Sequence, residues 1–252
     1  MAAPILIRLI VLEARRGGLP WLAAAALLAA LALAGFLSEV ALAESRMLQA
    51  AVMAALLRAC AVFLVAAQVV SSIAREIADK GLEAMLALPL PRPTHYLGRL
   101  AGFALLGSAL AVAFALPLLL VAPPAAVAAW CVSLACETVL VAAAALFFAM
   151  TLAQVVPAIA ATGGLYLLAR SMAGIQAIAG GAVEPSFAHT LARQAIDLIA
   201  LVVPRLDAAT RSEWLLYGAP PAGELGAAIG ALALYALLLT AAGLVDFQRR
   251  AA

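Results

Sequence analysis

The chain has 252 residues, of which 67% are hydrophobic and 11% are charged, and its mean hydropathy is +1.14. A soluble globular domain carries about 25% charged residues, so this composition predicts an integral membrane protein. The net charge of +2 gives no indication of a nucleic-acid partner.

The first predicted element is a short apolar helix over residues 4–16. Arg8, Arg15 and Arg16 share one side of this helix. Such a helix lies in the plane of the membrane interface, and the Gly17-Gly18 pair allows a sharp turn into the bilayer. The alternative is an ordinary positively charged flank of the first span.

Long apolar runs dominate the rest of the chain. A helix that crosses the bilayer core needs about 20 apolar residues. Six runs qualify: 19–41, 50–73, 97–121, 125–155, 157–179 and 222–245. Only Gln154 and Pro157 separate the fourth run from the fifth. Neither a linker nor an internal repeat divides the chain, so we expect a single transmembrane domain over residues 1–252.

The segment between the second and third spans, residues 75–99, is charged and amphipathic. At about 100° per residue, its charges share one arc of a helix and its apolar residues fill the opposite arc. The charged residues are Arg75, Glu76, Asp79, Lys80 and Glu83. We expect this helix to lie flat at the membrane surface, where the charged arc has no partner within the chain and binds another protein. The alternative is a solvated loop without a partner.

A second helix outside the spans is predicted over residues 187–203, where Pro204 ends it. Arg193 and Asp197 are four residues apart and are able to pair on its polar face. His189 is interpreted as a solvated surface residue.

Six spans place both termini on one side of the membrane, and the positive charges indicate which side. Nine cationic residues fall on the side of the termini and four on the opposite side. The first set is Arg8, Arg15, Arg16, Arg75, Lys80, Arg92, Arg99, Arg249 and Arg250; the second is Arg46, Arg193, Arg205 and Arg211. The positive-inside rule therefore predicts cytoplasmic termini and a cytoplasmic 75–99 segment, in a multi-pass protein of the bacterial inner membrane.

Three charged residues lie inside the predicted spans: Arg58, Glu137 and Arg170. An isolated charge at the bilayer centre costs about 2.5–3.5 kcal/mol on insertion scales, so such residues pair. Each lies roughly ten residues from the outer end of its span, so we expect all three to meet at one depth, with Glu137 between the two arginines. The cluster is either a polar site on a translocation path or an ion-paired clasp between the second, fourth and fifth spans.

Sequence motifs for catalysis are absent. The chain has no Walker A loop, GxGxxG, HExxH or GxSxG, and its two histidines, His95 and His189, fall on opposite sides of the membrane. We therefore predict no enzyme activity, no metal site and no cofactor in this chain. Any energy for work enters from another protein.

The 75–99 segment resembles the cytoplasmic loop of type-2 ABC exporter permeases. The pattern is R-E-(x)3-(K/R)-G-L-E-x-(M/L)-L-x-L-P-(x)2-R-(x)3-Y-x-G-(K/R), although family members more often have Thr between the first Gly and Leu. The matching residues are Arg75-Glu76, Lys80-Gly81-Leu82-Glu83, Met85-Leu86, Leu88-Pro89, Arg92, Tyr96 and Gly98-Arg99. The order of elements and the stretch 201–218 also resemble these permeases.

This resemblance implies an ATP-driven mechanism. Two permeases, either two copies or a copy and a paralogue, pair in the lipid bilayer, and a coupling helix of each docks on a cytoplasmic ABC ATPase that binds ATP and Mg²⁺. Here Arg75, Glu76, Asp79, Lys80 and Glu83 would contact the ATPase. The result is export, or force transmission to a periplasmic partner.

Two alternatives remain open at this point. One is the related haem-exporter permease of cytochrome c maturation. The other is a membrane assembly scaffold without transport, which has no need for an ATPase.

Overall fold

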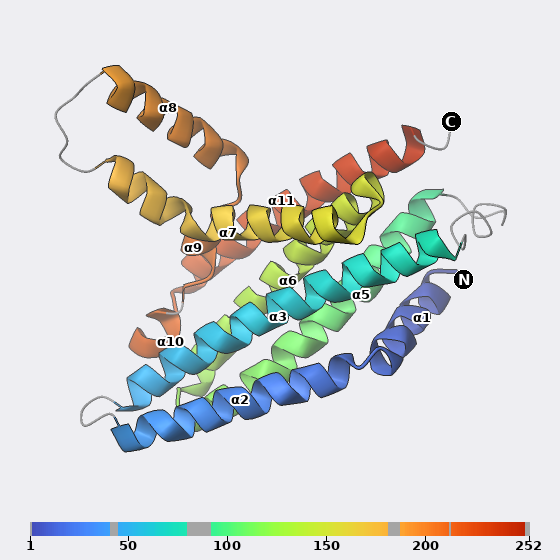
Figure 1. Cartoon of the computed structure of the whole chain (residues 1–252). Coiled ribbons are helices and arrows are strands. Elements are labelled where there is room, and N and C mark those ends of the chain that lie inside the picture. The colour runs from blue at the N-terminus through green and yellow to red at the C-terminus, as the bar shows by residue number, and fades with distance from the viewer. Residues whose placement is uncertain (1, 41–44, 80–91, 181–186, 212, 250–252) are drawn as a thin grey trace.

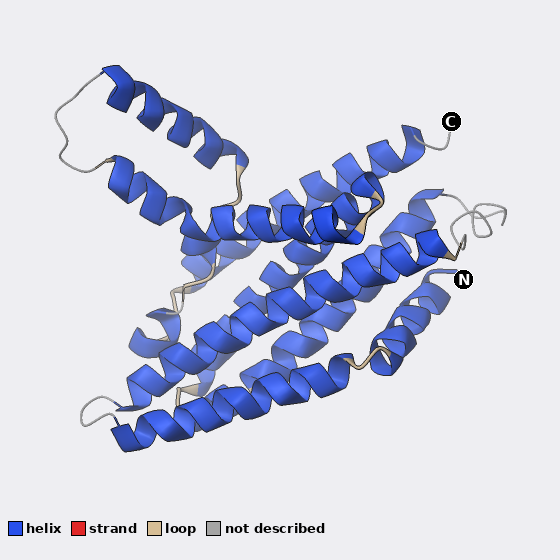
Figure 2. Cartoon of the chain, viewed as in Figure 1, coloured by secondary structure: helices blue, strands red, loops and turns tan. Residues whose placement is uncertain are grey.

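The computed structural model describes residues 2–40, 45–79, 92–180, 187–211 and 213–249, and every element within them is helical (Figures 1 and 2). The elements are α1 (Ala2–Arg16), α2 (Leu19–Val40), α3 (Ser45–Ala78), α5 (Arg92–Ala115), the 3₁₀ helix η1 (Pro117–Leu120), α6 (Pro124–Leu152), α7 (Val155–Ala179), α8 (Phe187–Val202), α9 (Leu206–Ala209), α10 (Glu213–Tyr217) and α11 (Ala222–Arg249).

Six of these helices, α2, α3, α5, α6, α7 and α11, are long and apolar enough to cross a bilayer. The chain is therefore an all-α, multi-pass membrane protein, which confirms the predicted fold class. Helix α1 and the last turns of α11 lie at the same end of the bundle (Figure 1). We call this the termini end and the opposite one the far end.

Helices α3 and α6 form the centre of the bundle. Their spanning segments are the most buried of the six, whereas α2, α7 and α11 leave most of their apolar surface exposed. The run Ala142–145 in α6 is buried throughout, because methyl side chains let neighbouring helices approach closely. Gly107 in α5 serves the same purpose, since a Cβ there would lie 2.8 Å from Thr138 Oγ1 of α6.

The helix predicted before the first span is present as α1. Leu6, Ile10 and Ala14 repeat every four residues and are buried, and Ile10 packs on Gly102 of α5. The turn into α2 passes through Gly18, whose φ of +83° lies in the region that favours glycine.

The main correction concerns the second span. Helix α3 has 34 residues and is therefore about 51 Å long, well beyond a hydrocarbon core of about 30 Å. Arg75 and Glu76 belong to the end of this helix and not to a separate helix lying on the membrane.

Two proline positions explain other boundaries. Pro117 has no N–H for an α-helical bond, and the chain continues as the 3₁₀ helix η1. Helix α6 ends at Leu152, the next residue Ala153 adopts a φ of +52°, and α7 starts at Val155. Pro157 lies within the first turn of α7, where its missing N–H leaves no bond unmade.

The helix predicted over residues 187–203 is confirmed as α8, which ends before Pro204. It forms a hairpin with the end of α7, away from the centre of the bundle (Figure 1). Asp197 accepts a hydrogen bond from Gln176 Nε2 of α7 at 3.3 Å, and the ion pairs of the described residues do not include the Arg193–Asp197 pair that the sequence allowed. The side chain of His189 is outside the described residues.

Candidate functional site

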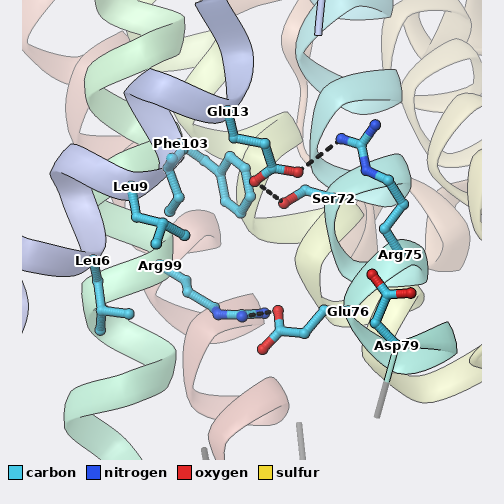
Figure 3. A pocket seen from close by; sticks show the side chains of 10 residues that line it. Leu6, Leu9, Glu13, Ser72, Arg75, Glu76, Asp79, Arg99 and Phe103 are labelled. Carbon is cyan, nitrogen blue, oxygen red and sulfur yellow. Dashed lines mark hydrogen bonds and ion pairs between the residues drawn. The ribbon is translucent and has the colours of Figure 1, made fainter. Parts of the chain in front are cut away.

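The ends of α1 and α3 are joined by polar contacts at the termini end. Arg75 Nη2 donates to Glu13 Oε1 at 2.7 Å, and Ser72 Oγ donates to the other Glu13 oxygen at 2.8 Å (Figure 3). Glu13 is the first acidic residue of the chain, and the next one is Glu39. Sequence reasoning missed this contact. The signal that could have predicted it is a single carboxylate on a helix whose other residues are basic or apolar.

A second ion pair joins α3 to α5. Glu76 Oε2 binds Arg99 Nη2, and both side chains are largely buried. The expectation that the charged arc has no partner within the chain is therefore wrong for Arg75 and Glu76. The cause is the length of α3, which carries both residues along the ends of α1 and α5 before the helix stops.

The remaining members of the charged arc are placed as follows. Asp79 is exposed, directly after the end of α3. Lys80 and Glu83 lie outside the described residues. Asp79 is thus the one member of the arc that the structure describes as an exposed charge without an ion pair among the described residues.

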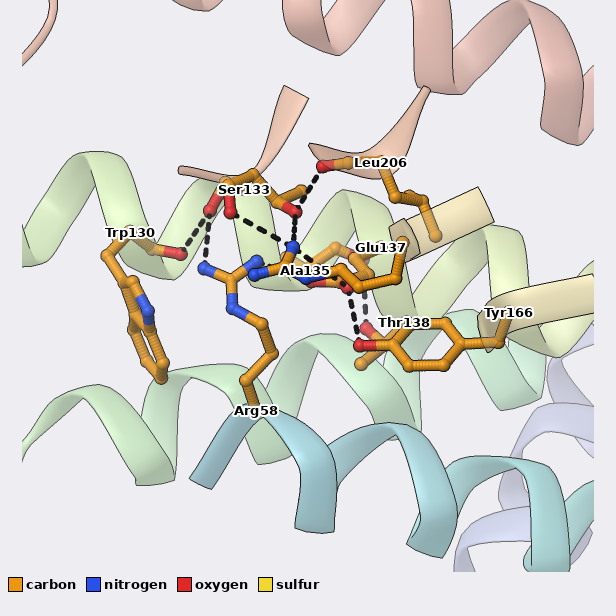
Figure 4. A network of polar contacts seen from close by, with 10 residues as sticks. Arg58, Trp130, Ser133, Ala135, Glu137, Thr138, Tyr166 and Leu206 are labelled. Carbon is orange, nitrogen blue, oxygen red and sulfur yellow. Dashed lines mark hydrogen bonds and ion pairs between the residues drawn. The ribbon is translucent and has the colours of Figure 1, made fainter. Parts of the chain in front are cut away.

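The intramembrane cluster is brought together by α3, α6 and α7. Arg58 Nη1 lies 2.5 Å from Glu137 Oε2 (Figure 4). Arg170 Nη1 lies 3.9 Å from Glu137 Oε1. Glu137 is completely buried and Arg58 is 2% exposed, so neither charge meets water or lipid. Helical rise from the ends of the spans places these residues at a common depth, as the sequence suggested.

Uncharged side chains complete this cluster. Tyr166 donates its hydroxyl to Glu137 Oε1 at 3.0 Å, and Arg58 Nη2 donates to Ser133 Oγ at 3.3 Å. The Arg58 guanidinium also lies 5.4 Å from the centroid of the Trp130 ring, within the range of a cation–π contact. Sequence reasoning missed these three neighbours. Ser133 precedes Glu137 by one helical turn, which was the only signal available for any of them.

Arg170 faces in two directions. Its Nη1 approaches Glu137 Oε1 and also donates to the carbonyl oxygen of Thr210, at 3.1 Å, and to the Thr210 hydroxyl. Beyond it lies an open cavity of about 590 Å³. The polar residues that line it are Arg170, Arg205, Asp207, Thr210, Arg211 and Glu213.

This geometry divides the cluster into two parts. The Arg58–Glu137 pair is enclosed within one chain, which favours the clasp between α3, α6 and α7. Of the three charged residues, Arg170 is the one that combines contact with the clasp and a place in the wall of the open 590 Å³ cavity. If any member of the cluster meets a transported molecule, the geometry favours Arg170.

No protein-family model matches this sequence, and no curated protein matches it.

Proposed function

We propose that this chain is the membrane-spanning subunit of a type-2 ABC exporter, which uses ATP hydrolysis by a separate cytoplasmic ATPase to drive export or to transmit force across the membrane. The single observation that carries the proposal is the sequence pattern over residues 75–99, in a segment that joins the second and third spans at the termini end. The interfacial α1 and the helix α8 before the last span support the same assignment.

The ion pairs at the termini end supply a means of transmitting force. Glu13–Arg75 joins α1 to α3, and Glu76–Arg99 joins α3 to α5. The two helices that flank residues 80–91 are therefore bound to each other and to α1. A displacement of this segment by an ATPase would move α1, α3 and α5 together. Without these ion pairs, the segment would bend and the helices would stay in place.

The apolar faces of α2, α7 and α11 support a pairing with a second permease. Large side chains such as Leu28, Leu167 and Leu237 are exposed on these helices. In a bilayer they contact lipid or another apolar helix, and a paired permease would cover part of this surface.

The docking surface is tested by reversing two acidic residues of the charged arc: Asp79, which is exposed, and Glu83, which lies outside the described residues. Asp79→Lys combined with Glu83→Lys, measured in the purified complex, should weaken ATPase binding about tenfold, since two like charges replace two opposite ones at the interface. Glu76 is unsuitable for this test because its reversal would break the ion pair with Arg99.

The matched control is Glu39→Lys, which reverses an exposed carboxylate at the far end of α2. It should leave ATPase binding unchanged. If the double variant binds the ATPase and supports coupled hydrolysis as the unmodified chain does, the docking assignment is wrong.

Purification from the native host separates this proposal from the scaffold. Mild detergent and mass spectrometry should recover a soluble subunit with Walker motifs in about equal amount. Recovery of the chain alone, repeated in lipid nanodiscs, would favour a scaffold, and additional haem-handling membrane subunits would favour the cytochrome c alternative.

A further inference from the structure

A cavity of about 290 Å³ lies between α1 and the adjoining ends of α3 and α5, and the proposed function assigns no ligand to it. Leu6, Leu9 and Phe103 form an apolar wall, and charged side chains from α3 and α5 form the opposite wall (Figure 3). Ligand pockets range from about 300 to 1,000 Å³, so the volume suits a small polar group and not an entire lipid.

The cavity lies near one end of the bundle, where the headgroups of a bilayer would lie. Helix α3 is about 51 Å long, against a hydrocarbon core of about 30 Å, so its ends would extend into the polar layers. Arg99 lies about 10 Å along α5 from Arg92, where that helix begins, and a polar layer is roughly 5–8 Å thick, so Arg99 would lie close to the inner boundary of this layer. The exposed Ile5 and Leu12 of α1 continue the apolar wall outward.

The described charged residues that line the cavity leave one negative charge in excess. Glu13, Glu76 and Asp79 face Arg75 and Arg99. Two ion pairs account for four of these residues, and Asp79 has no ion pair among the described residues. The site therefore complements a ligand that contributes a cation.

Two buried atoms in the same cavity wall lack hydrogen-bond partners among the described residues. Glu76 Oε1 has no donor and Arg99 Nη1 has no acceptor, although Arg99 is only 5% exposed. Buried polar atoms without partners are costly, about 1–3 kcal/mol each and more for charged groups. One ligand with both a donor and an acceptor would satisfy both atoms.

We propose that this cavity binds the headgroup of a phospholipid with a primary ammonium, phosphatidylethanolamine. The ammonium donates to Glu76 and Asp79, the phosphate is held by Arg75 and Arg99, and the acyl chains pass over Leu9. A choline headgroup carries the same charge but has no N–H to donate, and a glycerol headgroup has no cation. This inference does not rest on the proposed ATPase partner.

Native mass spectrometry of the purified full chain tests the proposal. Phosphatidylethanolamine, phosphatidylcholine and phosphatidylglycerol with identical acyl chains are added separately, and the fraction of protein that retains one lipid is measured. Phosphatidylethanolamine should be retained most strongly and should give the largest rise in unfolding temperature. Soluble phosphoethanolamine should compete only weakly because it lacks the acyl chains.

Two variants locate the site. Asp79→Asn leaves both ion pairs intact and should weaken the retention of phosphatidylethanolamine about fivefold, the upper end for a partly exposed charge pair. Leu9→Trp fills the cavity from the α1 side without changing any charge and should abolish the preference for this lipid. Glu39→Gln removes a carboxylate far from the cavity and should change nothing.

Three results would overturn the proposal. Equal retention of the three lipids would show nonspecific contact with surrounding lipid, and strongest retention of phosphatidylglycerol would show an anion site. Competition by phosphoethanolamine as strong as that of the intact lipid would identify a soluble zwitterion as the ligand. Persistence of the preference in both Asp79→Asn and Leu9→Trp would place the lipid elsewhere.

Discussion

Glu137 is the centre of the buried charge cluster in the bundle. Its carboxylate contacts Arg58 through one oxygen and Tyr166 through the other, while Arg170 approaches the second oxygen. All of this occurs at a fully buried position. A buried charge is tolerated only when its partners replace the solvation it has lost, so removal of one partner should be costly.

Glu137→Gln should therefore destabilise the chain by about 3 kcal/mol, because Arg58 would remain buried without a counter-charge. Thermal unfolding in detergent measures the effect as a lower unfolding temperature. Glu224→Gln is the matched control, since the ion pair between Glu224 and Arg211 is partly exposed and should contribute less than about 1 kcal/mol.

Replacement of both enclosed charges distinguishes charge from packing. Arg58→Met with Glu137→Leu removes the ion pair and its desolvation cost together, so the double variant should unfold at a higher temperature than Glu137→Gln. Normal stability of Glu137→Gln with lost transport by the assembled complex would instead assign Glu137 to the transport path.

Gly243 shows how closely α11 and α5 approach at the termini end. A Cβ at this position would lie 2.7 Å from Tyr96 Cζ and nearer still to the Tyr96 hydroxyl. Tyr96 is fully buried, so its ring has little room to move. Gly243→Ala should therefore cost about 1–3 kcal/mol, the usual range for an overpacked core.

Tyr96→Phe tests the cause of this loss. The Tyr96 hydroxyl has no hydrogen-bond partner among the described residues, so its removal alone should be nearly neutral. The phenylalanine variant should restore part of the unfolding temperature lost in Gly243→Ala. Equal losses with and without the hydroxyl would show that the clash involves the ring or the backbone of α5 and not the hydroxyl.

At the scale of elements, two ion pairs of different burial join the same group of helices. Glu76–Arg99 is nearly enclosed, whereas Arg75 of the Glu13–Arg75 pair is more than half exposed. The first pair loses more solvation when its partner is removed. The two pairs should therefore differ in their effect on stability, although both link α3 to a neighbouring helix.

Glu76→Gln should cost about 2 kcal/mol, between the values for exposed and fully buried pairs, and Glu13→Gln should cost less than about 1 kcal/mol. Thermal unfolding of the two single variants measures this order. An exchange of charges, Glu76→Arg with Arg99→Glu, should recover part of the loss. A larger loss in Glu13→Gln would mean that its bond from Ser72 matters more than the ion pair.

The sequence predicted elements better than it predicted contacts between them. The six spans, α1 and α8 follow from long apolar runs and from the spacing of buried side chains. The end of α3 was misplaced because Arg75 and Glu76 were expected to leave the bilayer for water. Their ion pairs depend on the arrangement of α1, α3 and α5 in space, which the spacing of residues within one segment does not contain.

The intramembrane cluster was more accessible to sequence reasoning. A charge inside an apolar run needs a partner, and equal depth limits the choice of partners for Arg58, Glu137 and Arg170. Ser133, Tyr166 and Trp130 were not identified because polar or aromatic residues are common in membrane helices and each has many possible neighbours. The contact between Arg170 and Thr210 depends on how the chain returns between α8 and α11.

At the scale of the whole molecule, burial is uneven around the bundle. Helices α3 and α6 are enclosed, while α2, α7 and α11 present apolar side chains outward. The ion pairs at the termini end and in the central clasp join α1, α3, α5, α6 and α7. Of these five helices, all except α1 are spans. In the proposed mechanism, displacement of the segment between α3 and α5 would be transmitted through α3 to the central clasp.

The distribution of positive charges predicts the orientation of the bundle in the membrane, and this prediction is open to a direct test. Arg16→Cys and Arg249→Cys place thiols at the termini end, and Arg193→Cys places one on α8. A membrane-impermeant maleimide applied to intact bacterial cells, with the outer membrane made permeable, should label only Arg193→Cys. The other two variants should react after the inner membrane is opened. The unsubstituted chain sets the background, since Cys60, Cys131 and Cys136 lie half-buried within spans.

Each alternative result of this labelling has a distinct meaning. Labelling of Arg16→Cys and Arg249→Cys alone in intact cells would reverse the orientation, and residues 75–99 would then face away from any cytoplasmic ATPase. Labelling of Arg193→Cys and Arg249→Cys from the same side would mean that α11 does not cross the bilayer. Because α11 is mostly exposed and contacts the bundle chiefly through α6, such a result would also require a different partner for its apolar surface.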